Sequence, residues 1–290
     1  MAVLQAGMLA CIWALQYLAM RGPSFSAVVS SQLAGNALSK IAPGGGAVGG
    51  ALQYKMLIQA GLPGPRAVAG LTAANLLSFA AVLAMPVLAV PAILRGGVSH
   101  DLLEATAVGL AVFVALFAIG AVLIAYDGAL AWVGRVIQRV RNRLRRRSEP
   151  LTQLPDRLLR ERDRIVGTLG PRWKRALAAT SGRWALDYAT LLAALAAVGS
   201  QPRPSLVLLA FCAAQILAQI PITPGGLGFV EAGLTAMLAL AGVATGDAVL
   251  ATFVYRLFSY WLPMPAGLLG AALHRRFYAR GSEPALSRRA

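Results

Sequence analysis

The segment from Pro221 to Glu231, with the sequence PITPGGLGFVE, contains residue types that could bind a charged group within an apolar region. Its glycines allow the backbone to turn sharply and to approach a ligand closely. A helix beginning after them would present unpaired N–H groups and the positive end of its dipole, which together favour a phosphate or a carboxylate. Glu231 lies early in this expected helix. An ionisable residue in an apolar segment is a candidate functional residue by default.

Arg256, which lies in the last apolar segment, is the candidate partner of Glu231. Such a pair could be structural or could belong to a transport site, and the sequence leaves both roles open. The glycines likewise could serve only the close packing of membrane helices. Elsewhere, Arg183 and Asp187 lie four residues apart, which predicts an ion pair on one helix face.

A second glycine-rich segment, PGGGAVGG, begins at Pro43 and follows Asn36. The Asn36 side chain could bind a ligand or, more simply, a neighbouring backbone group. The candidate binding residues lie in or beside the two glycine-rich segments, except Arg256, which is included as the partner of Glu231. They are Asn36, Pro43, Gly44, Gly45, Pro224, Gly225, Gly226, Gly228, Glu231 and Arg256.

Residue types that support catalysis or metal binding are scattered. Cys11 and Cys212 lie in apolar segments, where a thiol usually packs as a small apolar group. His100 and His274 are isolated from each other, one in an expected loop and the other in the basic tail. An intramembrane enzyme would need a nucleophile or a set of metal ligands. We therefore expect no enzyme activity, no metal and no cofactor.

The composition indicates an all-α polytopic membrane protein. The chain is 58% hydrophobic and 13% charged over 290 residues, whereas soluble domains contain about 25% charged residues. Apolar stretches of the length that spans a bilayer recur. They occupy residues 2–20, 67–94, 105–133, 176–199 and 247–272.

The net charge of +16 is concentrated in two clusters that flank apolar stretches. Residues 135–175 contain fourteen Lys or Arg against four acids, and the second cluster begins at Arg275. This distribution is typical of cytoplasmic loops in membrane proteins. No basic motif interleaved with aromatic residues accompanies it, so we do not expect a nucleic-acid partner.

The two halves of the chain are similar at a constant offset of 181 residues. Pro23-Ser24 corresponds to Pro204-Ser205, and Pro43-Gly44-Gly45 corresponds to Pro224-Gly225-Gly226. Residues 24–57 and 205–243 each contain two short apolar halves around such a break. Because irregular backbone at membrane depth must be buried in protein or line a wet cavity, we interpret both as re-entrant hairpins.

Placing the basic segment 134–175 in the cytoplasm makes the two halves inverted, with 24–57 entering from the cytoplasm and 205–243 from outside. If each short half of a hairpin instead crosses the bilayer completely, the orientations are the same, so this alternative stays open. The N-terminus then lies outside; one further span before Met1 would place it inside, which suggests either a late start or a shortened protein. The predicted units are a first membrane repeat (1–95), a linking span (96–133), a basic cytoplasmic loop (134–175), a second repeat (176–275) and a basic cytoplasmic tail (276–290).

The pattern PGG-x-G-x-x-E, followed by a span bearing Tyr-Arg-Leu, resembles the lysylphosphatidylglycerol synthase transmembrane region, also named the flippase-like or UPF0104 family. The first-half segment PGGGAVGGALQYKMLIQAGL is similar to an earlier motif of that family, which usually carries an acid followed by an arginine. Here Gly49 or Gly50 stands in the place of the acid, and Tyr54 or Lys55 in that of the arginine. This difference puts a mechanism with two acids in doubt.

The resemblance covers nearly the whole chain and implies a bacterial plasma-membrane protein. Well-known relatives fuse this region to a soluble aminoacyl-transfer domain, which we do not expect here because the chain ends soon after its last apolar stretch. We expect a flippase-like protein that binds and translocates a lipid or lipid-linked amphiphile. Its expected partners are membrane lipids with anionic headgroups. The alternative is an accessory or scaffold subunit of an envelope-lipid pathway, and homo-oligomers or a separate lipid-modifying enzyme stay open as partners.

Overall fold

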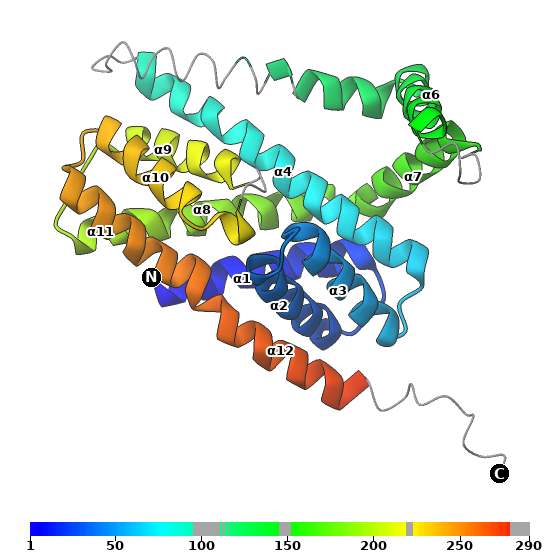
Figure 1. Cartoon of the computed structure of the whole chain (residues 1–290), viewed down its shortest axis with the longest axis horizontal. Helices are drawn as coiled ribbons and strands as arrows, with labels where there is room; N and C mark the ends of the chain where they lie inside the picture. The colour runs from blue at the N-terminus through cyan, green and yellow to red at the C-terminus, as the bar shows by residue number, and fades with distance from the viewer. Residues whose placement is uncertain (95–110, 112–113, 116, 145–151, 219–222, 279–290) are drawn as a thin grey trace.

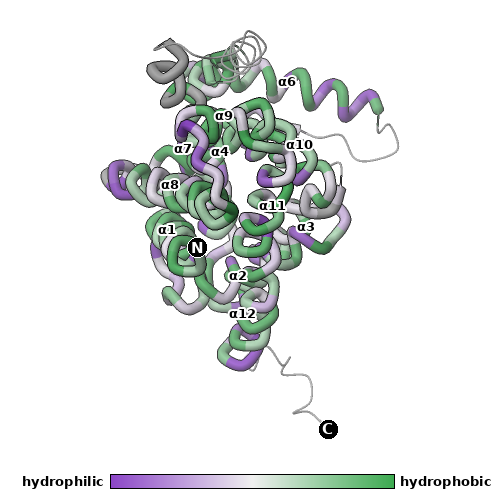
Figure 2. Tube along the Cα trace, turned by 90° about the vertical axis from the view of Figure 1, so that its left-hand side faces the viewer, coloured by the Kyte–Doolittle hydropathy of each residue, from purple (hydrophilic) through white to green (hydrophobic). Residues whose placement is uncertain are grey.

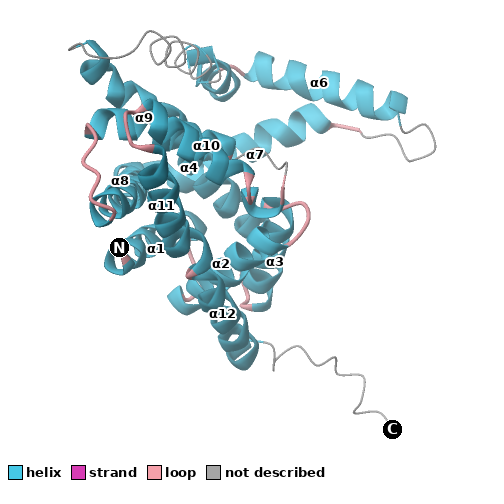
Figure 3. Cartoon of the chain, turned by 60° about the vertical axis from the view of Figure 1, so that its left-hand side comes forward, coloured by secondary structure: helices cyan, strands magenta, loops and turns pink. Residues whose placement is uncertain are grey.

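The computed structural model describes every residue except 95–110, 112–113, 116, 145–151, 219–222 and 279–290. All regular secondary structure in the described part is helical, with no strand (Figure 3). Two of its helices are long and apolar enough to cross a membrane, namely α1 (Ala2–Met20) and the Gly64–Val82 part of α4 (Gly64–Leu94). A third candidate is a bent pair, Phe117–Ala125 with α6 (Asp127–Leu144).

The first half continues from α1 into a helical hairpin, α2 (Phe25–Ile41) and α3 (Gly46–Gln59), and then into α4. The second half begins with α8 (Trp173–Ala197), followed by the hairpin α9 (Pro204–Leu217) and α10 (Phe229–Leu240). It ends with α11 (Thr245–Arg256), a π-helical turn (Leu257–Trp261) and α12 (Pro263–Tyr278). The hairpins therefore lie in the segments where the sequence predicts them.

Boundaries in the two halves match at the predicted offset. α4 begins at Gly64 and α11 at Thr245, while α3 ends at Gln59 and α10 at Leu240, so both pairs of boundaries are 181 residues apart. Local chemistry explains some of these ends. The Ser24 hydroxyl accepts the N–H of Ala27 and caps α2, and Pro204 occupies the first turn of α9, where a missing N–H costs nothing.

Helix packing between the halves is reciprocal (Figure 1). α1 packs against its counterpart α8, α2 packs against α12, and α9 packs against α4. Because α9 is the counterpart of α2 and α4 is the counterpart of α11 and α12, the last two contacts are equivalent. Such self-complementary packing is what a two-fold relation between two similar units produces.

Small residues allow the closest of these approaches. A Cβ atom added to Gly267 of α12 would lie 2.2 Å from Ala37 Cβ and 2.7 Å from the carbonyl oxygen of Leu33, both in α2. A Cβ on Gly35 would lie 2.8 Å from the carbonyl oxygen of Gly49 in α3. The backbones of α12, α2 and α3 are therefore in near contact, as is typical of membrane helices.

The two halves differ in their interiors. The largest apolar core lies mainly in the second half, around the rings of Trp184, Phe211 and Tyr255, which meet edge to face. Many large apolar side chains are exposed on the outer surface, including Val3, Leu268 and Phe277. Figure 2 shows apolar residues along most helices of the bundle. An apolar exterior of this kind needs lipid or a partner to cover it.

In the described part, the segments predicted as a linking span and a basic loop contain a sharp bend and two helices. Much of 105–133 lies outside the described residues, and the helix Phe117–Ala125 bends by 103° into α6, which begins at Asp127. The predicted loop 134–175 contains most of α6 and the amphipathic α7 (Leu154–Leu169), which pack on each other. Most of the tail 276–290 is outside the described part.

The stretch 247–272, predicted as one apolar span, contains α11 and α12 joined by the π-helical turn. Pro263 and Pro265 favour this irregular turn, since neither has an N–H to donate to a carbonyl in the preceding turn. The Leu262 N–H donates to the carbonyl oxygen of Leu257, five residues back, at 2.9 Å. The carbonyl of Ser259, four residues before Pro263, consequently has no donor from that helical position.

Candidate functional site

The Glu231–Arg256 ion pair predicted from the sequence is present. Arg256 Nε lies 2.6 Å from Glu231 Oε1, and the two side chains are 9% and 14% exposed. Arg256 Nη2 also donates to the carbonyl oxygen of Gly225 at 3.3 Å. Arg256 thereby attaches α11 to the turn between α9 and α10. Breaking a pair at this burial would leave one charge without compensation.

Glu231 also occupies the N-terminus of α10. Its second carboxylate oxygen accepts the N–H of Gly228 at 2.8 Å. The helix end that the sequence suggests as an anion site therefore already binds an anion, the carboxylate of Glu231 itself. A carboxylate there is stabilised by the free N–H groups and by the helix dipole.

The turn of the second hairpin contacts the end of α2, just before the turn of the first hairpin. Gly225 has φ of +63°, and a Cβ there would lie 2.7 Å from the carbonyl oxygen of Lys40. The Tyr260 hydroxyl donates to that same carbonyl at 2.8 Å. Both the left-handed backbone and the lack of space favour glycine at position 225.

Lys40 supplies the hydrogen-bond donor that the Ser259 carbonyl lacks in the π-helical turn. Its Nζ donates to the carbonyl oxygens of Ser259 at 2.9 Å and of Tyr260 at 3.0 Å. The Nζ also lies 4.9 Å from the centroid of the Tyr260 ring, and the Arg256 guanidinium carbon lies 4.3 Å from the same centroid. The two cations are thus held at one aromatic ring by hydrogen bonds and cation–π contacts.

A cavity of about 210 Å³ lies where these elements meet. Three cationic side chains line it, Lys40, Arg183 and Arg256, together with the carboxylate of Asp187. Asp187 is buried and accepts hydrogen bonds from Gln5 at 3.0 Å and from Tyr255 at 3.1 Å. Arg256 is paired with Glu231, so Lys40 and Arg183 against Asp187 leave an excess of one basic group in the walls, which suits an anionic group.

The ion pair predicted between Arg183 and Asp187 is absent from the described part of the structure. The Arg183 guanidinium instead lies 4.3 Å from the centroid of the Trp184 ring. Its position on α8 brings it to the wall of a second cavity as well as the first. Arg183, Asn36 and Ile12 line both cavities.

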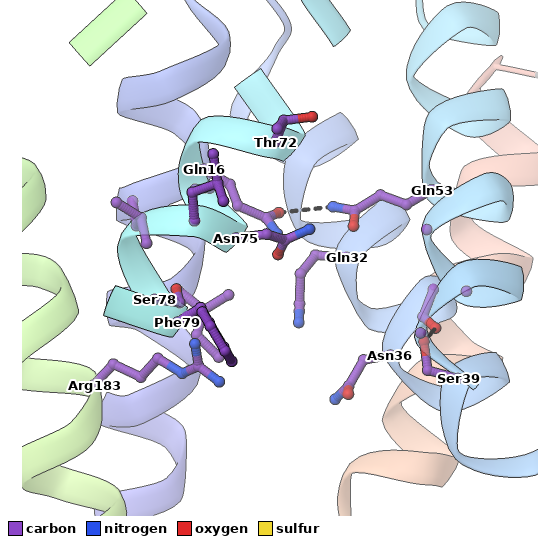
Figure 4. Close-up of a pocket in the computed structure, with 18 of the residues that line it drawn as sticks. Gln16, Gln32, Asn36, Ser39, Gln53, Thr72, Asn75, Ser78, Phe79 and Arg183 are labelled. Atoms are coloured by element: carbon purple, nitrogen blue, oxygen red, sulfur yellow. Dashed lines mark hydrogen bonds between the residues drawn. The ribbon is translucent and has the colours of Figure 1, made fainter. Parts of the chain in front are cut away.

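The second cavity, of about 600 Å³, lies mainly in the first half, against α8 of the second half, and is rich in amide and hydroxyl groups (Figure 4). Helices α1, α2, α3, α4 and α8 contribute to its walls. Its polar lining side chains are Gln16, Gln32, Asn36, Ser39, Gln53, Thr72, Asn75, Ser78 and Arg183. Three amides are already engaged: Gln53 Nε2 donates to Gln16 Oε1 at 2.7 Å, and Trp13 Nε1 donates to Gln32 Oε1 at 2.9 Å. Among its described lining residues, Arg183 is the one charged side chain.

Comparison with known proteins adds the family. The sequence profile of the lysylphosphatidylglycerol synthase TM region matches residues 1–267. The chain belongs to this family. A UPF0104 membrane protein of Methanothermobacter thermautotrophicus (strain Delta H) is 33% identical over 90 residues, which are 31% of this chain and 26% of that protein. The match thus spans about a quarter of the relative's length. A search of the solved structures finds no match.

Membership of the lysylphosphatidylglycerol synthase TM-region family identifies the chain as a membrane protein, in agreement with its apolar helices. Within this family member, some predicted site residues come together. Asn36 lines both cavities, and Gly225 and Arg256 line the smaller one. Pro224 begins a 3₁₀ turn beside Gly225.

Other predicted site residues lie outside the cavity walls. Pro43 and Gly44 are exposed at the turn between α2 and α3, and Gly45 is half-buried there. Gly226 is buried within its turn, whereas Gly228 is exposed and binds Glu231 through its N–H. These glycines shape the turns and do not line either cavity in this structure.

Sequence reasoning named Asn36 as a candidate and Arg183 as an ion-pair partner, but it missed a binding role for the other polar residues on the helices. Lys40 and Arg183 are ionisable residues in largely apolar helices, and Gln16, Gln32 and Gln53 are amides in similar positions. The signal that could have found them is the cost of placing such groups in a membrane helix without a partner. The sequence-based interpretation gave more weight to the breaks than to the flanking helices.

Proposed function

We propose that this membrane protein binds a lipid with an anionic headgroup where its two halves meet and moves it between leaflets. The observation that supports this function best is the cavity lined by Lys40, Arg183 and Arg256 against one carboxylate, Asp187. Cationic groups at membrane depth are costly, and they are generally retained where they serve a substrate path. A lipid phosphate is the anion that such a site would meet most often.

The inverted-repeat arrangement is part of the proposal. It is supported by the helix boundaries that recur after 181 residues and by the reciprocal packing of α2 with α12 and of α9 with α4. The hairpin helices contain 12 to 17 residues. At the α-helical rise they reach about 18–26 Å, less than a hydrocarbon core of about 30 Å. Re-entrant hairpins entering from opposite faces would place their turns near the midplane.

The Glu231–Arg256 pair suggests how the path could open. A lipid phosphate that enters the small cavity would compete with Glu231 for Arg256, because both are anions with oxygen acceptors. Arg256 also holds the turn of the second hairpin through its hydrogen bond to the carbonyl oxygen of Gly225. The hairpin turn is therefore held by the same group that would bind the substrate. In this proposal the residues bind and release, and no bond is made or broken.

A translocation assay tests the function. Purified protein in proteoliposomes is given fluorescently labelled phosphatidylglycerol, and dithionite quenching reports how fast the label changes leaflet. We expect faster exchange than in protein-free vesicles and a still higher rate for Glu231→Gln, because this variant removes the carboxylate that competes with the lipid phosphate for Arg256. The matched control is Asp156→Asn, which neutralises an exposed carboxylate on α7. Wild-type protein at the rate of protein-free vesicles would contradict a translocation function.

The second candidate function is that of an accessory subunit, and α6 is the observation that favours it. Its apolar side chains Trp132, Ile137, Val140 and Leu144 are exposed beside basic residues. A soluble lipid-modifying enzyme could bind this face. Stoichiometric co-purification with such a protein, lost on Ile137→Asp, together with absent translocation would favour this function. We also propose a plasma-membrane location with α6, α7 and the C-terminus in the cytoplasm, consistent with the basic clusters.

A further inference from the structure

The larger cavity occupies the place in the first half that the Glu231–Arg256 pair occupies in the second. At the offset of 181, Glu231 corresponds to Gly50 and Arg256 corresponds to Asn75. The residues that follow Arg256 in the π-helical turn correspond in the same way, Ser259 to Ser78 and Tyr260 to Phe79. Gly50, Asn75, Ser78 and Phe79 all line the larger cavity.

Both charges of the pair are absent from the first half, and the space they would fill is open. A Cβ atom on Gly50 would meet no other atom within 4 Å, whereas one on Gly49 would collide with the Ser39 side chain. Position 50 therefore faces the cavity, and position 49 is packed. Loss of only one charge would leave the other uncompensated, which explains why a neutral version replaces both.

The polar character of this cavity extends to positions that are apolar in the second half. Leu234, which is fully buried in the second-half core, corresponds to Gln53, and Leu217 corresponds to Asn36. In the described part of the structure, the side chains of Asn36 and Asn75 have no hydrogen-bond partner, although the cavity gives both of them space. Figure 4 shows both amides, and the guanidinium of Arg183, directed toward the open space.

These groups define a ligand chemistry. Amides and hydroxyls both donate and accept hydrogen bonds, as neighbouring hydroxyls on a ring require. The half-exposed Phe79 ring offers a flat apolar face beside them, and Arg183 offers one positive charge. A carboxylate that could bind an ammonium group is absent from the described lining residues. A volume of about 600 Å³ lies within the usual range for small-molecule sites.

We infer that the first-half cavity binds a cyclic polyol or sugar joined to one phosphate, and that it rejects cationic headgroups. This inference rests on the proposed lipid-binding function and gives it a headgroup class. The polyol binds Asn36, Asn75 and the neighbouring glutamines, and its phosphate binds Arg183. The first half then contains an open site that selects the headgroup. In the second half, the corresponding place is filled by the Glu231–Arg256 ion pair.

Binding measurements on the detergent-solubilised full chain test the inference. The probes are phosphatidylinositol, phosphatidylethanolamine and a cationic trimethylammonium lipid with the same acyl chains. We expect phosphatidylinositol to bind at least tenfold more tightly than either of the others, and Asn75→Ala to weaken it about tenfold, the value of roughly one hydrogen bond. The matched control is Asn142→Ala, an asparagine of α6 outside both cavities. Equal binding of the cationic lipid, or an unchanged affinity of Asn75→Ala, overturns the inference.

A soluble headgroup distinguishes a headgroup site from a site for acyl chains. Inositol 1-phosphate should displace phosphatidylinositol, and failure to displace it would show that the lipid is held elsewhere by its chains, which overturns the inference. The double variant Gly50→Glu with Asn75→Arg rebuilds the second-half pair in the first half. It should stay folded by size-exclusion chromatography and lose phosphatidylinositol binding. A folded double variant that binds phosphatidylinositol like the wild type also refutes the assignment.

The two proposals fail separately. If phosphatidylinositol binds and Asn75→Ala weakens it while no lipid is translocated, the headgroup site stands and the translocation function falls. If lipid is translocated while Asn75→Ala leaves binding unchanged, the translocation function stands and the headgroup assignment falls.

Discussion

Replacing Glu231 by glutamine removes one charge of the buried pair with almost no change of shape. The glutamine oxygen can still accept the N–H of Gly228, and Arg256 keeps the carbonyl of Gly225 and the Tyr260 ring. Removing one partner of a buried pair costs about 3–5 kcal/mol. Because Arg256 already makes its contacts with Gly225 and Tyr260 in the wild type, these contacts do not reduce that cost. We therefore expect the free energy of unfolding to fall by about 3–5 kcal/mol.

The measurement is equilibrium unfolding by sodium dodecyl sulfate in mixed micelles, followed by circular dichroism. Arg256→Gln and the double variant Glu231→Gln with Arg256→Gln complete a double-mutant cycle. Because the double variant buries no unpaired charge, its loss should be smaller than the sum of the two single losses by at least about 1 kcal/mol. The exposed Asp156→Asn serves as the control and should leave the midpoint unchanged.

Additive losses would refute this reasoning. Additivity would mean that each side chain stabilises the fold independently, and that the 2.6 Å contact between Arg256 and Glu231 contributes no coupling. A loss below about 0.5 kcal/mol for Glu231→Gln would equally show that water compensates Arg256 in spite of its burial. Either result would also weaken the proposed exchange of Glu231 for a lipid phosphate.

Two further predictions concern the π-helical turn and the topology. Lys40→Met removes the donors to the carbonyls of Ser259 and Tyr260, and should lower the free energy of unfolding by about 2–3 kcal/mol. Pro263→Ala restores an N–H four residues after Ser259, which can donate to the Ser259 carbonyl in place of Lys40. In the Pro263→Ala protein, Lys40→Met should therefore lower the free energy of unfolding by about 1 kcal/mol less than it does in the wild type, as measured by the same unfolding titration. An equal loss in the two proteins would contradict our explanation. In a cysteine-free background, Gln59→Cys and Leu240→Cys mark the exposed ends of the equivalent helices α3 and α10. A membrane-impermeant maleimide added to right-side-out vesicles should label only the second, and labelling of both from one side would exclude inverted halves.

The sequence alone predicts the features that depend on local chemistry or on regular spacing. Composition and the length of the apolar stretches indicate an all-helical membrane protein, and the Pro-Gly-Gly segments mark the turns of two hairpins. The pairing of Glu231 with Arg256 is predictable because an unpaired charge in an apolar segment is costly. The family assignment follows from the same motifs and is confirmed by the profile match to residues 1–267.

The tertiary structure decides the features that join distant segments. Lys40 finds its carbonyl partners more than 200 residues away in the π-helical turn, and Arg183 reaches two cavities from the middle of α8. Neither position follows from helical periodicity, which places residues on a face without naming what that face meets. The local sequence also does not reveal the difference between the halves. Only the packing shows that Gly50 faces an open, polar cavity, whereas its counterpart Glu231 binds Arg256.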